Sequence, residues 1–261
     1  MKYSTNYTTQ ELMVSAAARE IKDGEVVFVG IGLPVLATML AQRTHAPNIV
    51  MIYEAGVVGA NPARLALSIG DPTLFSGSLM ALDFHDIFAM FLQKGLCDVS
   101  FMSGSQIDKY GNINSTVIGD YEKPKVRLPG SGGAYDLGAH AKKTLIIAPH
   151  EKRRLVEKID FITTVGYLTG HDSRQKIGIR GGGPSAAITT LGVLRFEKET
   201  KEMYLDTYHP GITVQQVKDN TGWDLKISPD VHETELPTEE QIRLLREELD
   251  PRGIFLKGGV G

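Results

Sequence analysis

A glutamate at the end of an apolar run is the first residue in this sequence whose position suggests chemistry. The stretch NIVMIYEAGVVGAN, residues 48–61, reads as a strand that ends in Glu54 and continues into small residues and glycine. Asn, Asp or Ser would close a simple turn, because their side chains bond the local backbone. A carboxylate at the mouth of a strand can instead act as a nucleophile or an acid–base group. Position alone leaves open a helix cap or an ion pair with an arginine.

A glycine-rich loop is the second candidate. The stretch VRLPGSGGAYDLG, residues 126–138, contains the small residues Gly130, Ser131, Gly132, Gly133 and Ala134 in succession. Without large side chains, the backbone N–H groups of such a loop can approach a ligand oxygen closely and stabilise a developing negative charge. The alternative interpretation of the same residues is a tight turn.

Other common catalytic motifs are missing. GIGLPV contains Gly30 and Gly32 but lacks the third glycine of a dinucleotide fingerprint, and the chain has neither a P-loop nor a G-x-S-x-G elbow. The seven histidines show no paired ligand spacing, so no metal site is expected. The single cysteine, Cys97, excludes an internal disulfide and favours a reducing compartment, which predicts a cytoplasmic protein.

Composition narrows the class of partner. The 261 residues are 42% hydrophobic and 23% charged, which is ordinary for a globular protein. Lys and Arg total 28 against 31 Asp and Glu, a formal charge of −3. This balance gives no reason to expect nucleic acid or an acidic membrane as a partner. No signal peptide or apolar run long enough to span a membrane is recognised, so small molecules and proteins are the expected partners.

Helical and strand patterns alternate through the first two-thirds of the chain. A capping box at Thr8 and Glu11 begins a helix that stops at Asp23-Gly24. This alternation predicts an α/β fold with an open, mainly parallel sheet flanked by helices. Strands are predicted at 25–29, 48–53, 97–104 and 143–148, and further helices at 35–43, 84–95 and 150–159. Lys152, Arg153 and Arg154 would then form a solvated face of the last of these helices.

The pattern changes after about residue 185. Residues 186–210 read as strands joined by short polar turns, which predicts an antiparallel hairpin. A final helix begins at Thr238, with Gln241 completing its cap, and Ile242, Leu245 and Leu249 form its apolar face. We therefore predict one domain over 1–261, made of an α/β core (1–185) and a C-terminal antiparallel extension with a helix (186–261).

Ligands of an open parallel sheet bind at the carboxyl ends of its strands. Three stretches follow predicted strands in this way: GIGLP, EAGVVGANP and GSQIDKYGNINST, at residues 30–34, 54–62 and 104–116. Glu54 is expected in or beside this cleft. Gly30, Gly32, Gly56 and Asn112 are the predicted lining of a ligand pocket in this cleft, which the segments 59–72 and 76–88 would also approach.

The motifs taken together are more specific than any one of them. YEAGVVG, GSQIDKYGNINST, PGSGGA and HEKRRLVEKIDFIT occur in this order, and LREELDP follows near the C-terminus. The combination resembles the B subunit of class I CoA-transferases, in particular of the glutaconate type, over nearly the whole chain. The resemblance implies a fold of the CoA-transferase and ribose-5-phosphate isomerase kind, which agrees with the pattern of elements.

The resemblance also implies a mechanism. In that family the glutamate matching Glu54 attacks an acyl-CoA, and a glutamyl-CoA thioester then carries CoA to a second carboxylic acid in a ping-pong reaction. By similarity, the Gln106 amide and the loop Gly132, Gly133 and Ala134 are the candidate donors to the glutamyl carbonyl. The resemblance also implies that the pocket predicted at Gly30, Gly32, Gly56 and Asn112 takes the acyl group or CoA. A loop-closing hydrogen bond is the alternative role for Gln106. No permanently bound cofactor is implied, since the coenzyme A thioester is itself the substrate.

The resemblance covers one half of such an enzyme, so an A subunit is expected as a partner in a heterotetramer or a larger assembly. Two other functions stay open. One is an acyl-CoA hydrolase, or a ring-opening carbon–carbon hydrolase acting on CoA-linked intermediates, on the same fold. The other is a non-catalytic subunit that only supports its partner, which predicts a degraded glutamate or glycine loop. Retention of Glu54 in YEAG favours transfer.

Overall fold

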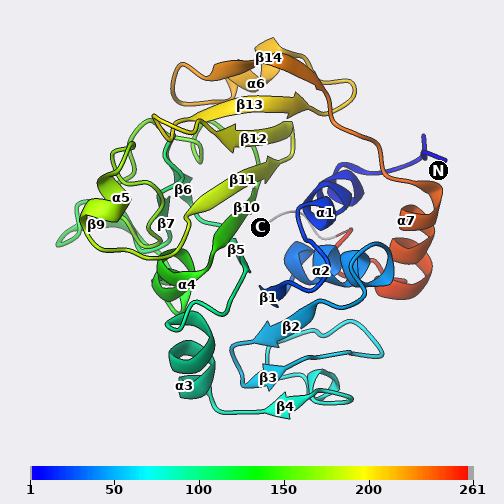
Figure 1. The fold of residues 1–261 in the computed structure, drawn as a ribbon. Coiled ribbons are helices and arrows are strands. Elements are labelled where there is room, and N and C mark those ends of the chain that lie inside the picture. Colours follow the sequence, from blue (N-terminus) through cyan, green and yellow to red (C-terminus); the bar gives the residue numbers. More distant parts are fainter. Residues whose placement is uncertain (1, 258–261) are drawn as a thin grey trace. The chain divides into compact units, whose positions relative to one another are not determined.

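The computed structural model describes residues 2–257, which form two compact units (Figure 1). The first unit contains the described residues up to Phe101 together with those from Glu235 onward, and the second is Met102–Thr234. These units run across the division predicted at residue 185, because the C-terminal helix belongs with the N-terminal part of the chain. That residues 1–261 form one domain stays a prediction.

The first unit contains a sheet with the strand order β5-β1-β2-β3-β4. The strands β5, β1 and β2 run parallel, while β3 and β4 return antiparallel. Its elements are α1 (Thr9–Arg19), β1 (Val26–Phe28), α2 (Leu33–Arg43), β2 (Val50–Tyr53), β3 (Val57–Val58), the 3₁₀ turn η1 (Pro72–Leu74), β4 (Met80–Ala81), α3 (Phe84–Asp86), the π-helical turn η2 (Ile87–Leu92), β5 (Val99–Met102), α7 (Glu239–Arg243) and the π-helical turn η3 (Leu244–Leu249).

Two capping boxes begin helices of the first unit as the sequence predicts. The Thr8 side chain accepts a hydrogen bond from the Glu11 N–H, and the Glu11 carboxylate accepts one from the Thr8 N–H, at the start of α1. Thr238 and Gln241 make the same exchange at α7. The predicted apolar face of the last helix is buried, as its members Ile242, Leu245 and Leu249 show. Local signals therefore set where these helices begin.

The second unit contains strands in the order β14-β13-β12-β11-β10. The pairs β11–β12 and β12–β13 are antiparallel, which confirms the predicted hairpin, whereas β14 runs parallel to β13. Its elements are β6 (Gln106–Ile107), β7 (Ile113–Asn114), β8 (Val117–Gly119), β9 (Pro124–Arg127), α4 (Ala134–His140), β10 (Lys143–Ala148), α5 (Ser173–Lys176), β11 (Pro184–Thr189), β12 (Gly192–Phe196), β13 (Met203–Tyr208), α6 (Val214–Asp219) and β14 (Lys226–Glu233).

The helix predicted over 150–159 is wrong. These residues form turns whose backbone groups pair with distant parts of the second unit. The Ile107 N–H donates to Arg154 O at 2.7 Å, and the Gly222 N–H donates to Leu155 O at 2.7 Å. Leu155 is fully buried in the core of this unit. Pairing and burial of these groups replace the intrahelical bonds that the local pattern favoured.

The basic cluster is accordingly not a helical face. The Arg153 side chain is exposed and bonds Glu151 at 2.7 Å, while Arg154 is partly buried and donates to the carbonyl oxygen of Gly104.

The predicted α/β class is confirmed, with a mixed, mostly parallel sheet flanked by helices. A search of the described residues finds no helix of the length and apolarity that a membrane crossing requires.

Candidate active site

Glu54 lies in a tight connection between two strands of the first unit. It follows β2, and β3 begins three residues later, so Glu54, Ala55 and Gly56 form the whole turn of a hairpin in which Tyr53 faces Val57. The Gly56 N–H donates to Tyr53 O at 3.0 Å and closes the turn. Glu54 is partly buried. A short, bonded turn leaves the backbone of Glu54 less freedom than a long loop would.

Gly56 is required by this turn. Its φ of +107° is a conformation that residues with a Cβ rarely adopt. A Cβ there would lie 2.8 Å from the Leu82 carbonyl carbon and closer still to the Leu82 oxygen. The Leu82 N–H also donates to Gly56 O at 2.7 Å. The backbone just after β4 therefore supports the turn that carries Glu54.

Gly30 and Gly32 reach the same edge of the sheet as Glu54. Strand β1 runs parallel to β2 with Phe28 opposite Ile52, so the residues two positions further on, Gly30 and Glu54, leave their strands at the same level. Gly32 has a φ of +107° and precedes α2 at its N-terminus. A Cβ on Gly30 would meet no atom within 4 Å, so the space beside this backbone is open. The predicted placement at the carboxyl ends of parallel strands is confirmed for these residues.

Tyr53 carries a buried hydroxyl next to Glu54 in the chain. The residue is fully buried, and its hydroxyl has no hydrogen-bond partner among the described residues. Burial raises the pKa of this phenol well above its usual range, because the ionised form would lose its hydration. Tyr53 is therefore a neutral, buried phenol next to Glu54 in the chain, and sequence reasoning did not single it out.

The glycine loop of the second unit is held at both ends. The Gly130 N–H donates to Ser115 O at 2.8 Å, and the Ser115 hydroxyl donates to Gly130 O at 2.9 Å. Ala134 begins α4 and donates to Ser131 O at 2.9 Å. Between these anchors, the N–H groups of Gly132 and Gly133 bond no group in the part of the chain that is described. Two donors of the predicted kind are thus left for another acceptor.

Gln106 takes part in a network within the second unit. Its Nε2 donates to Asp160 Oδ2 at 2.9 Å, and its Oε1 accepts from the Asp160 N–H at 3.0 Å and from Asn114 Nδ2 at 2.7 Å. These bonds are the loop-closing role that the sequence left open. Its role as a donor to substrate stays a prediction. Asp160 has no local sequence signal that links it to Gln106.

Asn112 is almost completely buried, with an exposed fraction of 1%. Its Nδ2 donates to Asp108 Oδ2 and to Leu168 O, both at 2.8 Å. Its Oδ1 accepts from the Gly166 and Leu168 N–H groups at 2.9 and 3.0 Å. The Asn112 side chain therefore joins its own loop to the loop at residues 166–168. Its assignment to an acyl or CoA pocket stays a prediction.

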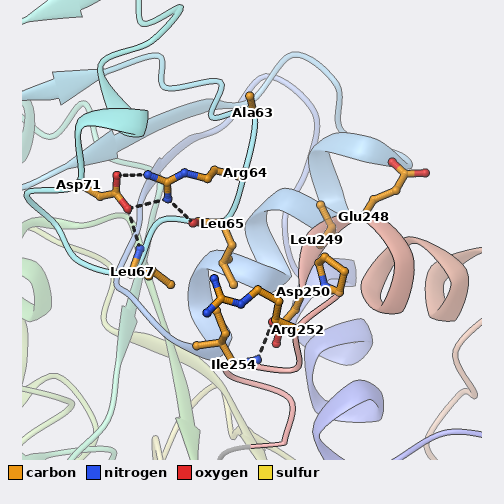
Figure 2. A pocket seen from close by; sticks show the side chains of 11 residues that line it. Ala63, Arg64, Leu65, Leu67, Asp71, Glu248, Leu249, Asp250, Arg252 and Ile254 are labelled. Atoms are coloured by element: carbon orange, nitrogen blue, oxygen red, sulfur yellow. Dashed lines mark hydrogen bonds and ion pairs between the residues drawn. The ribbon is translucent and has the colours of Figure 1, made fainter.

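The segment 59–72 lines a cavity of about 270 Å³ within the first unit (Figure 2). Leu65, Leu67 and Ile254 give it apolar walls. Arg64 is turned toward Asp71 and donates two bonds of 2.8 Å to that carboxylate. This pairing holds the pKa of Asp71 well below its usual range. Glu54 is not among the lining residues, so this cavity is separate from the Glu54 turn, and Arg64 is already engaged by a carboxylate of the chain itself.

Known proteins share both the sequence and the fold of this chain. The family model described as Coenzyme A transferase matches residues 10–220. The chain belongs to the coenzyme A transferase family. The B subunit of the 3-oxoadipate CoA-transferase of Pseudomonas knackmussii is 47% identical over 240 residues, which is 92% of each chain.

Two further members of the family extend the comparison. The B subunit of the glutaconate CoA-transferase of Acidaminococcus fermentans is 38% identical over 97% of this chain and 96% of its own. The crystal structure of that glutaconate CoA-transferase superposes with a TM-score of 0.91 over 98% of this chain and 100% of the matched chain. The cholesterol ring-cleaving hydrolase IpdB subunit of Rhodococcus jostii is 26% identical over 85% of this chain and 83% of its own. The chain is thus similar to B subunits of CoA-transferases, and the resemblance predicted from its sequence is confirmed.

Proposed function

We propose that this chain is the B subunit of a CoA-transferase in which Glu54 carries CoA between two carboxylic acids. The observation that carries the proposal is the placement of Glu54 in a three-residue hairpin turn at the carboxyl edge of parallel strands, beside the open backbone at Gly30. Membership of the coenzyme A transferase family supplies the reaction class.

The proposed chemistry is a balanced exchange. The Glu54 carboxylate attacks the thioester carbonyl of an acyl-CoA and expels the CoA thiolate, which leaves an acyl-glutamyl anhydride. The thiolate then attacks the glutamyl carbonyl, which releases the first acid and leaves a glutamyl-CoA thioester. A second carboxylate attacks this thioester, and the thiolate it expels attacks the incoming acyl group. The products are a new acyl-CoA and the original Glu54 carboxylate, so the covalent steps need no ATP or redox partner.

A carboxylate is a weak nucleophile in water, so its surroundings must limit hydration and stabilise the oxyanions formed. The short turn restricts the backbone of Glu54, and the residue is partly buried, which reduces its contact with water. The donors to the oxyanions are proposed to be Gln106 and the loop Gly132, Gly133 and Ala134. The unbonded N–H groups of Gly132 and Gly133 support this assignment.

The substrates are proposed to be CoA esters of dicarboxylic acids. Two of the similar relatives are named for 3-oxoadipate and glutaconate, which both carry two carboxylates. Because those relatives are named as B subunits, an A-type subunit is the proposed partner, in a heterotetramer or a larger assembly. The panel that tests substrate choice is 3-oxoadipate, glutaconate and the monocarboxylate butyrate as CoA acceptors.

The decisive experiment traps the intermediate. The chain, co-expressed with its A-type subunit, is incubated with an acyl-CoA and then with borohydride, and the modified residue is located by mass spectrometry. Reduction of a glutamyl-CoA thioester leaves the alcohol at position 54 in the wild type, and Glu54→Gln abolishes both the label and the transfer. The control Glu199→Gln removes an exposed carboxylate and retains both.

A different outcome would reassign the reaction. If acyl-CoA is consumed with Glu54 unmodified and free CoA accumulates, the chain acts as a hydrolase. Cleavage of a ring in a CoA-linked substrate, without release of free CoA, would instead match the activity named for the cholesterol ring-cleaving relative.

A further inference from the structure

Arg174 carries a buried side chain for which the proposed reaction gives no reason. The residue lies on α5 in the second unit, and its exposed fraction is 1%. All of its hydrogen bonds go to backbone carbonyl oxygens, and no carboxylate in the described part of the chain pairs with it. Burying a charge without a counter-ion is costly, so these carbonyl groups must together satisfy the guanidinium.

The carbonyl groups belong to three separate segments of the second unit. Arg174 Nη2 donates to the last turn of α4, at 2.6 Å to Gly138 O and 3.3 Å to Ala139 O. Its Nη1 donates to Val165 O at 3.1 Å and to Gly166 O at 2.9 Å. The Nε group donates at 2.9 Å to a carbonyl that precedes β11. Because the guanidinium is planar and its N–H directions are fixed, these bonds set where α4 lies relative to the segment at 165–166.

Helix α4 connects this arginine to the glycine loop. A Cβ on Gly138 would lie 3.2 Å from Val165 O and would clash with Thr164 Cγ2, so the helix packs closely against the segment that Arg174 holds. At the other end of α4, Gly133 is the N-cap and its carbonyl accepts the first helical bond at 3.0 Å. Gly133 and Gly138 are only about 8 Å apart along the helix axis. A tilt of α4 would therefore move the unbonded N–H groups of the loop.

The segment that Arg174 holds also supports the first end of the glycine loop. Thr163 lies two residues before Val165, and its hydroxyl accepts a hydrogen bond from the Ser115 N–H at 2.9 Å. Ser115 in turn exchanges two hydrogen bonds with Gly130, where the loop begins. Arg174 is thus bonded both to the helix that follows the loop and to the segment that supports its start.

From these contacts, we infer that Arg174 is a positioning residue for the N–H groups of Gly132 and Gly133, an inference that rests on the proposed function. Arg174 does not touch the substrate. It fixes the two supports of the loop, so the donors keep their directions while charge develops on the thioester carbonyl. Donors held in place before the reaction stabilise an oxyanion without paying for their own rearrangement.

Single-turnover labelling of Glu54 tests this role in the complex with the A-type subunit. The complex, in excess, is mixed with an acyl-CoA, and the borohydride-trapped label is followed over time. The amplitude reports the folded fraction, which a merely structural role would change, whereas the rate constant reports the site. Because an ammonium lacks the planar set of donors, Arg174→Lys should lower the rate constant roughly tenfold to 100-fold. A rate constant equal to that of the wild type would overturn the inference.

Leu225→Ala is the control for lost stability. Leu225 is 2% exposed in the core of the second unit, so its truncation also destabilises that unit. Leu225→Ala should keep the wild-type rate constant and change only the amplitude. If it slows labelling as much as Arg174→Lys does, the positioning role is wrong.

Thr163→Val removes a single hydroxyl and keeps the test open if Arg174→Lys fails to fold. Thr163 is 4% exposed, and its hydroxyl lies 2.7 Å from Thr116 Oγ1. Thr207→Val is the matched control, because Thr207 is 9% exposed and its hydroxyl lies 2.8 Å from Thr234 Oγ1. Thr163→Val should lower the rate constant about threefold to tenfold, and Thr207→Val should leave it unchanged. Equal rate constants in these two variants would overturn the inference.

Glycine-selective NMR of the isolated chain separates this inference from the proposed function. The amide signals of Gly132 and Gly133 should shift in Arg174→Lys, while that of Gly211, an exposed glycine of the same unit, should not. If both signals shift but the wild-type complex never labels Glu54, the positioning role stands and the covalent mechanism is wrong. If the wild-type complex labels Glu54 while the variant keeps both signals and the rate constant, the mechanism stands and the positioning role is wrong.

Discussion

Replacing Gly56 with alanine tests how strictly the backbone holds Glu54. Alanine at a φ of +107° carries a strain of about 1–3 kcal/mol. Its Cβ would also lie 2.8 Å from the Leu82 carbonyl carbon, so the turn and residue 82 must separate. That movement would break the 2.7 Å bond from Leu82 N–H to Gly56 O, worth about 1 kcal/mol. Together these effects predict that the free energy of unfolding falls by about 2–4 kcal/mol.

Gly95→Ala is the matched control. Gly95 also has a positive φ, +73°, but a Cβ there would meet no atom within 4 Å. Its cost should be the backbone strain alone, about 1–2 kcal/mol. Urea unfolding of the two isolated variants measures the difference, and kcat of the complexes reports whether Glu54 has moved. If Gly56→Ala costs no more than Gly95→Ala and leaves kcat unchanged, the Leu82 contact does not position the turn.

Three further predictions concern buried polar groups. Burial lowers the pKa of His150 and of His209 to about 4, so both rings are neutral in the folded state. Because the unfolded chain binds these protons below pH about 6.5, the free energy of unfolding should fall by up to roughly 3 kcal/mol per histidine as the pH drops from about 6.5 to about 4. NMR titration of the two rings, with unfolding measured across the same pH range, tests this prediction. Tyr53→Phe removes a buried hydroxyl that has no partner among the described residues, and should be neutral or stabilise the protein by about 1 kcal/mol. Tyr167→Phe loses a 2.8 Å bond to Pro184 O and should destabilise the protein by about 1 kcal/mol. Thermal melts that rank the two variants in the opposite order would contradict this prediction. Arg174 is 1% exposed and donates to backbone carbonyls of five residues. Both Arg174→Met and Arg174→Lys should therefore lower the free energy of unfolding by about 3–5 kcal/mol. If Arg174→Lys unfolds in urea at the wild-type midpoint, the charge matters and the guanidinium geometry does not.

Local signals in the sequence determined much of the fold. The capping boxes at Thr8 and Thr238 and the apolar face of the last helix are correct, because capping and helical periodicity depend on residues within a few positions of each other. The parallel placement of Gly30 beside Glu54 is also correct, since alternating strands and helices restrict how strands can pair.

Long-range pairing is where the local patterns failed. The stretch 150–159 has a helical pattern, yet the carbonyl groups of Arg154 and Leu155 accept bonds from residues 107 and 222. Strand β14 likewise joins β13 in parallel, although the extension 186–261 was predicted to contain antiparallel strands. A sequence window contains only one partner of such a contact.

The sequence by itself determined the residue types that can do chemistry, the family resemblance and the strand after which Glu54 stands. Only the tertiary structure decided that Glu54 lies in a three-residue turn supported by Leu82, that Gln106 and Asn112 bond within the second unit, and that both residues of β4 are exposed. The physical reason is that exposure and hydrogen-bond partners are properties of the packed chain. They depend on which distant segments meet, whereas a motif depends only on neighbours in the sequence.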